Sequence, residues 1–472
     1  MHQASAKGTY ALLGILLFSL LSQFTGLFLI LRKDPPPLRG GDTWTYERPA
    51  FALLRHGVYA NNPDSPEVPE LVRPPGYPLL IALSTLLLGT HQVPLVTLQI
   101  LANAATLLVA WRIARKLWGS RGGLAAALWL ALDFCTVIYG LRLMTESLYT
   151  LLMMLAVAAG VRLLEEERVD HGAAFRFGLF MALAVYLRVI GWYLFYASSL
   201  GMLGLLAWRR VPWRRLGTIA LCAALPWVVL TGAWRLRTYR LTGEARFSYA
   251  LSSHSSLGVS VLVYGRGLTA DEAWRRFGAL GPHPSLPCGT FNPTAAALRA
   301  AGITLQGFYR HCAEQARALR RQEPWTVVRA TAFAAFILMA FPHEETALQD
   351  YFAAPVLVGE PLGDLWRLPI RAYLDKWFGA NLYRWFAFLG TFAHLWLSYL
   401  GIGVVLWRLA RGRREHRALH ALLLGVLLYH VLTASTRGVS AVFGVPRYRA
   451  PVMPVLAAYV GALFGRRHEA SS

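Results

Sequence analysis

Long hydrophobic segments separated by short polar ones dominate the chain. Residues 8–31 carry no charged side chain and are long enough to cross a hydrocarbon core of about 30 Å at about 1.5 Å per residue. Similar segments bounded by charge recur at 93–111, 122–141, 147–163, 174–188, 190–208, 216–234, 385–407, 418–436 and 448–465. The pattern predicts an all-α polytopic membrane protein with about ten transmembrane helices.

The first hydrophobic segment, 8–31, also has to be compared with a secretory signal. The apolar region of a signal peptide is shorter, about 7 to 15 residues, and no small-residue cleavage site precedes the charged residues 32–34. We therefore expect a retained first helix. Of the 472 residues, 56% are hydrophobic and only 15% are charged, which excludes a soluble multidomain protein.

The basic residues are placed in a way that predicts the topology. Lysine and arginine outnumber the acids 47 to 25, for a net charge of +22. They cluster at the ends of hydrophobic segments, as the positive-inside rule describes for cytoplasmic loops, so the charge does not indicate a nucleic-acid partner. The clusters are Arg112/Arg115/Lys116/Arg121, Arg209/Arg210/Arg214/Arg215, Arg408/Arg411/Arg413/Arg414/Arg417 and Arg466/Arg467.

With the amino terminus inside, the same rule places 32–92, 235–384 and 437–447 outside. This topology divides the chain into three parts. An amino-terminal transmembrane catalytic module, 1–234, contains the first outer loop. A large outer, periplasmic region with short helices follows, and carboxyl-terminal transmembrane helices occupy 385–472.

Three apolar segments are expected to be helices that do not span. In the first outer loop, 46–55 is amphipathic and 79–88 is too short to cross, so both are expected along the membrane surface. Segment 325–341 is apolar but contains Arg329, and one more span here would place the arginines at 408–417 outside. We therefore expect an interfacial or re-entrant helix there.

The four cysteines divide into two pairs. Cys135 and Cys222 lie in hydrophobic segments and are expected to be apolar filler. Cys288 and Cys312 lie in the outer region, where they can form a disulfide if that region faces an oxidising compartment. Two free thiols are the alternative.

Asp42 is the first candidate for chemistry. It follows two glycines and precedes Trp44 and Tyr46, whose rings can stack on a sugar or sit at the headgroup level. A general base for a hydroxyl acceptor suits this setting. The alternative is that Asp42 caps the helix that follows.

Arg73 is the first candidate for binding phosphate. Prolines 74–75 have a fixed φ and stiffen the turn that leads to Tyr77, and guanidinium grips phosphate with two hydrogen bonds. Tyr77 and, at the start of the last span, Tyr448 are candidate substrate-binding residues, as are Trp44 and Tyr46. Arg449, next to Tyr448, is interpreted as an anchor in the aromatic belt. Other arginines expected at the outer face, with the same potential role as Arg73, are Arg142, Arg188, Arg235, Arg237 and Arg447.

Two more acids lie in or beside hydrophobic segments. Glu146 falls in the turn before the segment 147–163, on the same face as Asp42, and is a second catalytic candidate. A helix cap or a partner of Arg142 is the alternative. Asp133 lies inside a span and is expected to be a buried packing or pairing acid.

Several site motifs are missing from the sequence. There is no HExxH, no CxxC, no Walker loop, no Rossmann fingerprint and no GxSxG. The sequence therefore does not support a dedicated zinc site or a cytosolic nucleotide-driven mechanism.

In their order and spacing, these motifs resemble the GT-C class of integral-membrane glycosyltransferases, in particular the bacterial branch related to protein O-mannosyltransferases and the lipid A aminoarabinose transferase. The matching positions are Asp42, 73–80, 114–119, 143–146 and 447–454. The resemblance implies a GT-C fold. It also implies inverting transfer of a sugar from a polyprenyl-phosphate donor, here expected to be undecaprenyl phosphate, to a glycan, lipid or protein acceptor.

The resemblance also implies residue roles and a location. Asp42 matches the first-loop base, and Glu146 matches an acid that supports substrate binding. Thr43 stands where the mannosyltransferases continue with a second acid, which argues against a metal-dependent or strictly protein-directed role. No cofactor is expected, and a divalent metal stays open. The expected location is the bacterial inner membrane, with the site facing the periplasm.

Two other functions share the lipid partner. A flippase or transporter of polyprenyl-linked glycans would show charges in several spans and internal repeats. An oligosaccharide polymerase or ligase would favour long outer loops with paired arginines or histidine. The sequence shows no repeat, and the early position of Asp42 favours the transferase.

Overall fold

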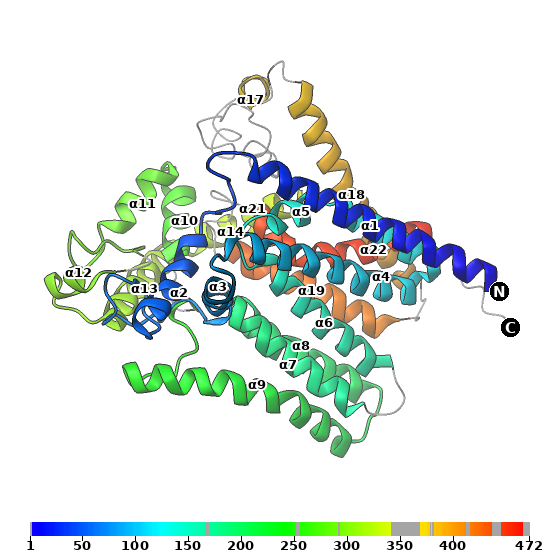
Figure 1. Ribbon diagram of the computed structural model, residues 1–472, viewed down its shortest axis with the longest axis horizontal. Helices are drawn as coiled ribbons and strands as arrows, with labels where there is room; N and C mark the ends of the chain where they lie inside the picture. The colour runs from blue at the N-terminus through cyan, green and yellow to red at the C-terminus, as the bar shows by residue number, and fades with distance from the viewer. Residues whose placement is uncertain are drawn as a thin grey trace.

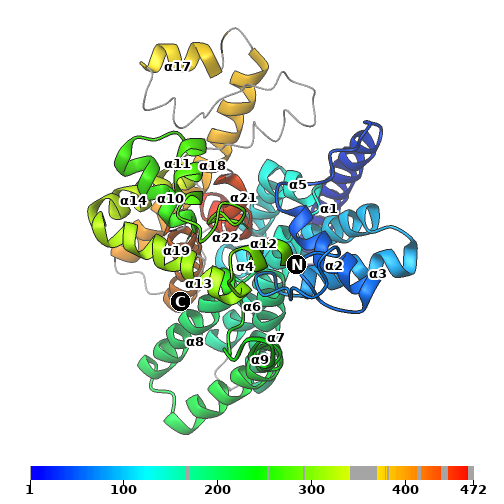
Figure 2. The ribbon, with the colours of Figure 1, turned by 90° about the vertical axis from the view of Figure 1, so that its left-hand side faces the viewer.

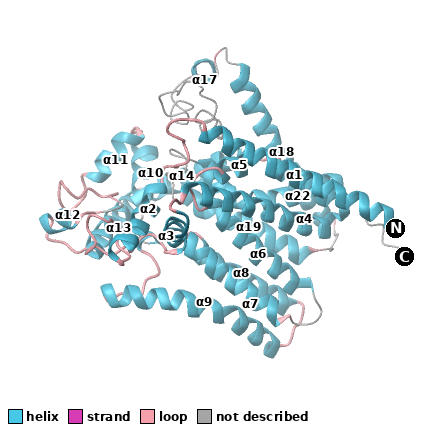
Figure 3. Cartoon of the chain, in the orientation of Figure 1, coloured by secondary structure: helices cyan, strands magenta, loops and turns pink. Residues whose placement is uncertain are grey.

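The computed structural model describes residues 2–165, 170–251, 255–290, 293–340, 369–377, 379, 382–411, 416–436 and 445–465. In these ranges every regular element is a helix, and the only extended pairing is two isolated β-bridges (Figure 3). Six of the helices are long and apolar enough to cross a membrane: 7–31, 92–131, 146–165, 213–242, 389–410 and 417–435. The prediction of an all-α membrane protein is confirmed.

Each predicted span falls on one or more helices of a bundle (Figure 1). The bundle helices are α1 (His2–Leu31), α4 (Gln92–Ala131), α5 (Phe134–Gly140), α6 (Glu146–Glu165), α7 (His171–Leu187), α8 (Gly191–Trp208), α9 (Trp213–Thr242), α18 (Leu382–Ala410), α19 (Arg417–Thr436) and α22 (Met453–Phe464). The last span is divided: α21 (Val445–Arg449) and the 3₁₀ turn η2 (Ala450–Val452) precede α22.

Helix α4 is an antiparallel hairpin whose two legs meet at Gly119. Gly119 has φ 74° and ψ −176°, a conformation that is essentially confined to glycine. Residues on either side of it meet: Asn103 Nδ2 donates to the carbonyl of Thr136 at 3.2 Å, and Gln99 Nε2 to that of Gly140 at 3.0 Å. In a straight helix these partners would lie about 50 Å or more apart. The two spans predicted at 93–111 and 122–141 are the legs.

The second leg of this hairpin breaks at Asp133. The Asp133 carboxylate caps α5, since its Oδ2 accepts from the backbone N–H of Thr136 at 2.7 Å and from the hydroxyl at 2.6 Å. His394 Nε2 of α18 lies 3.8 Å from the other oxygen. Asp133 is therefore the buried pairing acid that the sequence predicts.

Helix α22 packs against α4 and α18 inside the bundle. Trp118 Nε1 donates to the carbonyl of Ala458 at 2.8 Å. Gly122 and Gly461 let the two backbones touch, because a Cβ on Gly461 would lie 2.7 Å from the Gly122 carbonyl oxygen. Such close contact between small residues is typical of membrane helix pairs.

Most of the loop helices gather at one end of the molecule (Figure 1), the end that faces the viewer in Figure 2, whereas α17 (Ile370–Trp377) lies apart from them at the top of both views. The first loop supplies α2 (Thr43–His56) and α3 (Gly76–Leu88), which confirms two short helices there. The helices of the second region are α10 (Ser255–Arg266), α11 (Ala270–Gly278), α12 (Ala295–Ala300), α13 (Leu305–Gln322), α14 (Pro324–Ala340) and α17 (Ile370–Trp377).

The two loop regions share one hydrophobic core. Val68, Leu71 and Val72 of the first loop pack with Phe277 and Phe308 of the second. This core is separate from that of the bundle. The large loop is thus held against the first loop by apolar contact.

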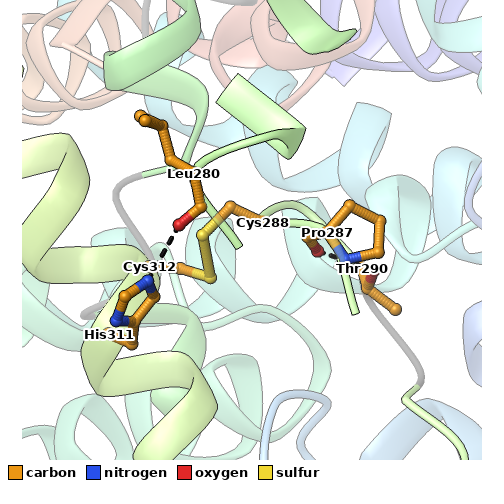
Figure 4. Close-up of a disulfide and its surroundings, with 6 residues drawn as sticks. All are labelled: Leu280, Pro287, Cys288, Thr290, His311 and Cys312. Atoms are coloured by element: carbon orange, nitrogen blue, oxygen red, sulfur yellow. Dashed lines mark hydrogen bonds between the residues drawn. A yellow bond between two sulfur atoms is a disulfide. The ribbon is translucent and has the colours of Figure 1, made fainter. Parts of the chain in front are cut away.

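A disulfide joins Cys288 to Cys312 of α13, with their Cα atoms 5.4 Å apart (Figure 4). Beside it, His311 Nε2 lies 2.8 Å from the carbonyl oxygen of Leu280. The structure therefore has the disulfide, not the two free thiols. Cys135 and Cys222 form no disulfide in the described part of the chain.

Helix α14 covers most of the segment 325–341, and its carboxyl end is inserted among the bundle helices. The hydroxyl of Tyr399 in α18 donates to the carbonyl of Met339 at 2.5 Å, and Arg449 Nη1 donates to that of Leu338 at 3.0 Å. Arg449 is only 1% exposed, so its interpretation as a surface anchor is wrong. It holds α14 instead. Predictions for 341–368, 437–444, Arg413, Arg414, Arg466 and Arg467 lie outside the described residues.

Candidate active site

Five charged side chains from distant parts of the chain alternate in sign at the loop end of the bundle. We call Arg73, Asp42, Arg447, Glu146 and Arg188 the charge cluster. Asp42 Oδ2 lies 3.5 Å from Arg73 Nη2 and 2.5 Å from Arg447 Nη2. Glu146 Oε1 lies 3.3 Å from Arg447 Nε and also pairs with Arg188 Nη1. Arg447 thus links the two acids.

Asp42 occupies the position before α2, but its side chain does not cap that helix. The Thr45 hydroxyl donates to the Asp42 carbonyl at 2.7 Å, while the carboxylate faces the arginines. The Thr43 hydroxyl donates to the carbonyl of Leu143 at 2.7 Å, which ties this loop to the turn before α6. The capping interpretation is therefore wrong.

Arg73 is oriented by aromatic side chains. Its guanidinium lies 4.6 Å from the centre of the Tyr46 ring, and its Nη1 donates to the Tyr46 hydroxyl at 3.2 Å. Tyr77 meets the same ring edge-on at 5.4 Å and donates to Gln99 Oε1 of α4 at 2.7 Å. Both tyrosines therefore lie beside the cluster, where the sequence predicts substrate-binding residues.

Glu146 begins α6, and Arg188 ends α7. Glu146 is 1% exposed, and its ion-pair partners in the described structure are Arg188 and Arg447, not Arg142. The interpretation of Glu146 as the partner of Arg142 is therefore wrong. The ring of Tyr448 lies 5.8 Å from the Arg188 guanidinium and 5.1 Å from that of Arg447.

The charge cluster has a positive excess, since three guanidinium groups face two carboxylates. Burial would raise the pKa of Asp42, but the charges of Arg447 and Arg73 outweigh it and hold this pKa well below its usual value. Asp42 is therefore ionised at neutral pH. Its side chain is 26% exposed against 1% for Glu146, so Asp42 is the carboxylate that a bound molecule can reach.

Other predicted site residues lie elsewhere. Trp44 is 40% exposed and stacks with Arg48, and Arg235 donates to the carbonyl of Ala245 at 2.9 Å. Arg142 is half-buried, and the described contacts of the charge cluster do not include it. Arg237 donates to backbone carbonyls of the first loop. Of the predicted phosphate-binding arginines, the structure brings together Arg73, Arg188 and Arg447.

Two buried acids near the site escaped the sequence reasoning. Glu47 pairs with His91 at 2.9 Å and with Arg39 at 3.1 Å. Glu70 accepts backbone hydrogen bonds in the turn before Arg73, and its position three residues before that arginine is the signal that could have revealed it. In the described part of the chain, no three His, Cys, Asp or Glu side chains gather as metal ligands.

The architecture is shared with a solved oligosaccharyltransferase. The apo form of the Archaeoglobus fulgidus oligosaccharyltransferase aligns with a TM-score of 0.52 and 12% identity, over 96% of this chain and 50% of that chain. This chain therefore spans half the length of that transferase. ArnT from Cupriavidus metallidurans bound to undecaprenyl phosphate aligns over 91% of this chain and 77% of that chain, with a TM-score of 0.42 and 15% identity.

A family model adds sequence evidence. Residues 72–230 match the model for dolichyl-phosphate-mannose-protein mannosyltransferases. The match includes Arg73, Glu146 and Arg188, whereas Asp42 and Arg447 lie outside it. No curated protein matches the sequence. The match to this family model and the fold shared with the oligosaccharyltransferase agree with the resemblance to the GT-C class of integral-membrane glycosyltransferases.

Proposed function

We propose that the protein transfers a sugar from a polyprenyl-phosphate donor, undecaprenyl phosphate in a bacterium, to a hydroxyl of a glycan, lipid or protein acceptor, with inversion. The charge cluster carries this proposal, because it combines a positive excess for a phosphate with one reachable carboxylate. The matched family model, named for transferases that use a lipid-phosphate sugar, supports the donor class.

Arg73 and Arg447 bind the donor phosphate in this proposal. Their side chains are 16% and 19% exposed, so each keeps some surface for a ligand while most of it is fixed by protein contacts. The side chain of Arg188 is only 9% exposed, and it adds further positive charge to the site. Because the leaving lipid phosphate is already a stable anion, guanidinium groups stabilise it and no general acid is needed.

Glu146 acts as a positioning residue in this scheme. It is almost fully buried, so it does not meet the acceptor. Its contacts with Arg188 and Arg447 fix two cations that would otherwise repel each other. Glu146 and Asp42 thus have different roles, because Glu146 positions the arginines and Asp42 meets the acceptor.

Asp42 is the proposed base. It removes the acceptor proton while the acceptor oxygen attacks the anomeric carbon, the bond to the lipid phosphate breaks, and the configuration inverts in one displacement. The donor phosphate competes with Asp42 for Arg447 and Arg73. Donor binding therefore loosens the ion pairs that keep Asp42 a weak base, and its pKa rises when it is needed.

We place this reaction on the periplasmic side of the bacterial inner membrane. The Cys288–Cys312 disulfide supports an oxidising compartment for the loop end. The arginine clusters at Arg112–Arg121 and Arg209–Arg215 flank hydrophobic segments whose other ends lead to the loops, as expected for the cytoplasmic side.

The test is transfer of a radiolabelled sugar from a defined polyprenyl-phosphate donor by the purified protein in vesicles. Asp42→Asn removes the base but keeps a side chain of the same size, so we expect turnover to fall by about 10²- to 10⁴-fold while donor binding is retained. Asp64→Asn is the control, because Asp64 lies in the same loop with its side chain 81% exposed. A fully active Asp42→Asn enzyme would refute the assignment of the base. Movement of the lipid across the vesicle without transfer would favour a flippase.

A further inference from the structure

Glu70 is a buried acid that lies outside the charge cluster. It is 1% exposed and belongs to the loop that leads from α2 to Arg73. Its Oε1 accepts hydrogen bonds from the backbone N–H groups of Val72, at 2.6 Å, and Arg73, at 2.7 Å. One carboxylate oxygen therefore fixes the two peptide groups that lead into the phosphate-binding arginine.

The carbonyl side of Arg73 is fixed as well. The hydroxyl of Tyr59 donates to the carbonyl of Arg73 at 3.1 Å and to that of Pro74 at 3.2 Å. The N–H and the carbonyl of Arg73 are thus both held by side chains, those of the buried Glu70 and the half-buried Tyr59, and the prolines that follow have a restricted φ. Its guanidinium is left in place to meet Asp42 at 3.5 Å.

The turn that contains Glu70 is tied to α9 and to the large loop region. The N–H of Glu70 donates to the carbonyl of Tyr59 at 3.1 Å, and its own carbonyl accepts from Arg237 Nη1 of α9 at 3.1 Å. The Ser248 hydroxyl donates to the carbonyl of Val72 at 2.5 Å. The turn before Arg73 is therefore built jointly by both loops.

A buried carboxylate is unfavourable unless its environment compensates it. Burial raises the pKa of Glu70, while the two backbone hydrogen bonds and the charges of Arg73 and Arg237 oppose this shift. An apolar residue would fill the same space without a desolvation cost, but it would leave two buried N–H groups without an acceptor.

We propose that Glu70 is a positioning residue for the donor phosphate: it holds the main chain of Arg73 so that the guanidinium is ready for the phosphate before the lipid binds. This inference rests on the proposed function. Glu70 touches neither the substrate nor the carboxylates of the charge cluster, and it acts through Arg73.

The test measures the dissociation constant of undecaprenyl phosphate and, separately, the KM of the sugar donor. Glu70→Ala removes the acceptor, and we expect both constants to rise about tenfold or more with a smaller change in kcat. Glu70→Gln keeps an oxygen in the place of Oε1, so it should stay close to wild type. Glu67→Ala is the matched control, since Glu67 is an exposed acid of the same loop.

A double-mutant cycle separates positioning from general destabilisation. In an Arg73→Ala background, Glu70→Ala should cause no further loss of undecaprenyl phosphate affinity. The inference would be overturned if the affinity losses of the two single variants multiply in the double variant, or if the Glu70→Ala protein has wild-type affinity. If Glu70→Ala does not fold, as judged by an absent Cys288–Cys312 disulfide, Tyr59→Phe is measured in its place. This variant releases the carbonyl of Arg73 from its hydrogen bond. Unchanged affinity for undecaprenyl phosphate in Tyr59→Phe would also overturn the inference.

The binding readout keeps this inference distinct from the proposed function. A protein whose affinity for undecaprenyl phosphate depends on Arg73 and Glu70 but which transfers no sugar would refute the transferase and leave the positioning role. A protein that transfers sugar, but whose affinity for undecaprenyl phosphate is unchanged by Glu70→Ala, would refute the positioning role and leave the transferase.

Discussion

At the scale of single residues, exposure decides what each acid can do. Asp42 and Glu146 both pair with Arg447, yet only Asp42 has a side chain that a substrate hydroxyl can reach. Their residue types are too similar to separate them in the sequence. The difference arises because Glu146 begins a helix inside the bundle, whereas Asp42 lies in a loop.

The pH dependence of turnover tests the pairing of Asp42. In the free protein Arg447 and Arg73 hold the pKa of Asp42 well below its usual value, so the carboxylate stays ionised far into the acid range. In the proposed mechanism, the donor phosphate draws the arginines away from Asp42, and the pKa of Asp42 rises. We therefore expect the acid limb of the kcat profile, which reports the donor complex, to lie at higher pH than that of kcat/KM for the donor, which reports the free enzyme. Coincident acid limbs would contradict the exchange of partners.

At the scale of elements, the tight reversal in α4 sets the geometry of the site. The hairpin brings Gln99 of the first leg to the carbonyls of Gly140 and Arg142 at the end of the second, at 3.0 and 2.6 Å. Gln99 also accepts from Tyr77, which lies against Tyr46. The turn at Gly119, at the other end of the legs, therefore determines how the aromatic support of Arg73 is placed.

Gly119→Ala tests this reversal. A Cβ is strained at φ 74° and ψ −176°, so we expect a loss of about 1 to 3 kcal/mol in the free energy of unfolding, measured from thermal unfolding in detergent. Gly201→Ala in α8 is the control, because no atom lies within 4 Å of the added Cβ and its φ is outside the positive range. A neutral Gly119→Ala would argue against the sharp turn.

At the scale of the whole molecule, the protein consists of a membrane bundle and a loop region with its own core (Figure 1). The charge cluster lies where the two meet, since Asp42 and Arg73 come from the first loop and Glu146, Arg188 and Arg447 from the ends of bundle helices and α21. In the proposed function, a donor lipid in the membrane and an acceptor outside it both approach this junction.

The disulfide is expected to stabilise the loop region more than the bundle. Replacing Cys288 and Cys312 by serine opens a link between residues 24 positions apart, which costs about 2 to 4 kcal/mol. Limited proteolysis should then cut within 255–322 sooner, while fragments of the bundle stay protected. Cys222→Ser, at a free cysteine of α9, serves as the control. Equal protease resistance with and without the disulfide would refute this expectation.

The sequence by itself determined the class of the fold and most members of the site. Uncharged segments of membrane length and arginine-rich ends are local properties, so they predict spans and topology before any contact forms. Asp42, Arg73 and Arg447 likewise stood out because of their neighbours in the chain. Only the tertiary structure decided the pairings: Glu146 with Arg188 instead of Arg142, Arg449 with α14 instead of the lipid surface, and Asp42 with an arginine 405 positions away. Ion pairs depend on distances of a few ångströms, and those distances are set by the packing of helices that are remote in sequence.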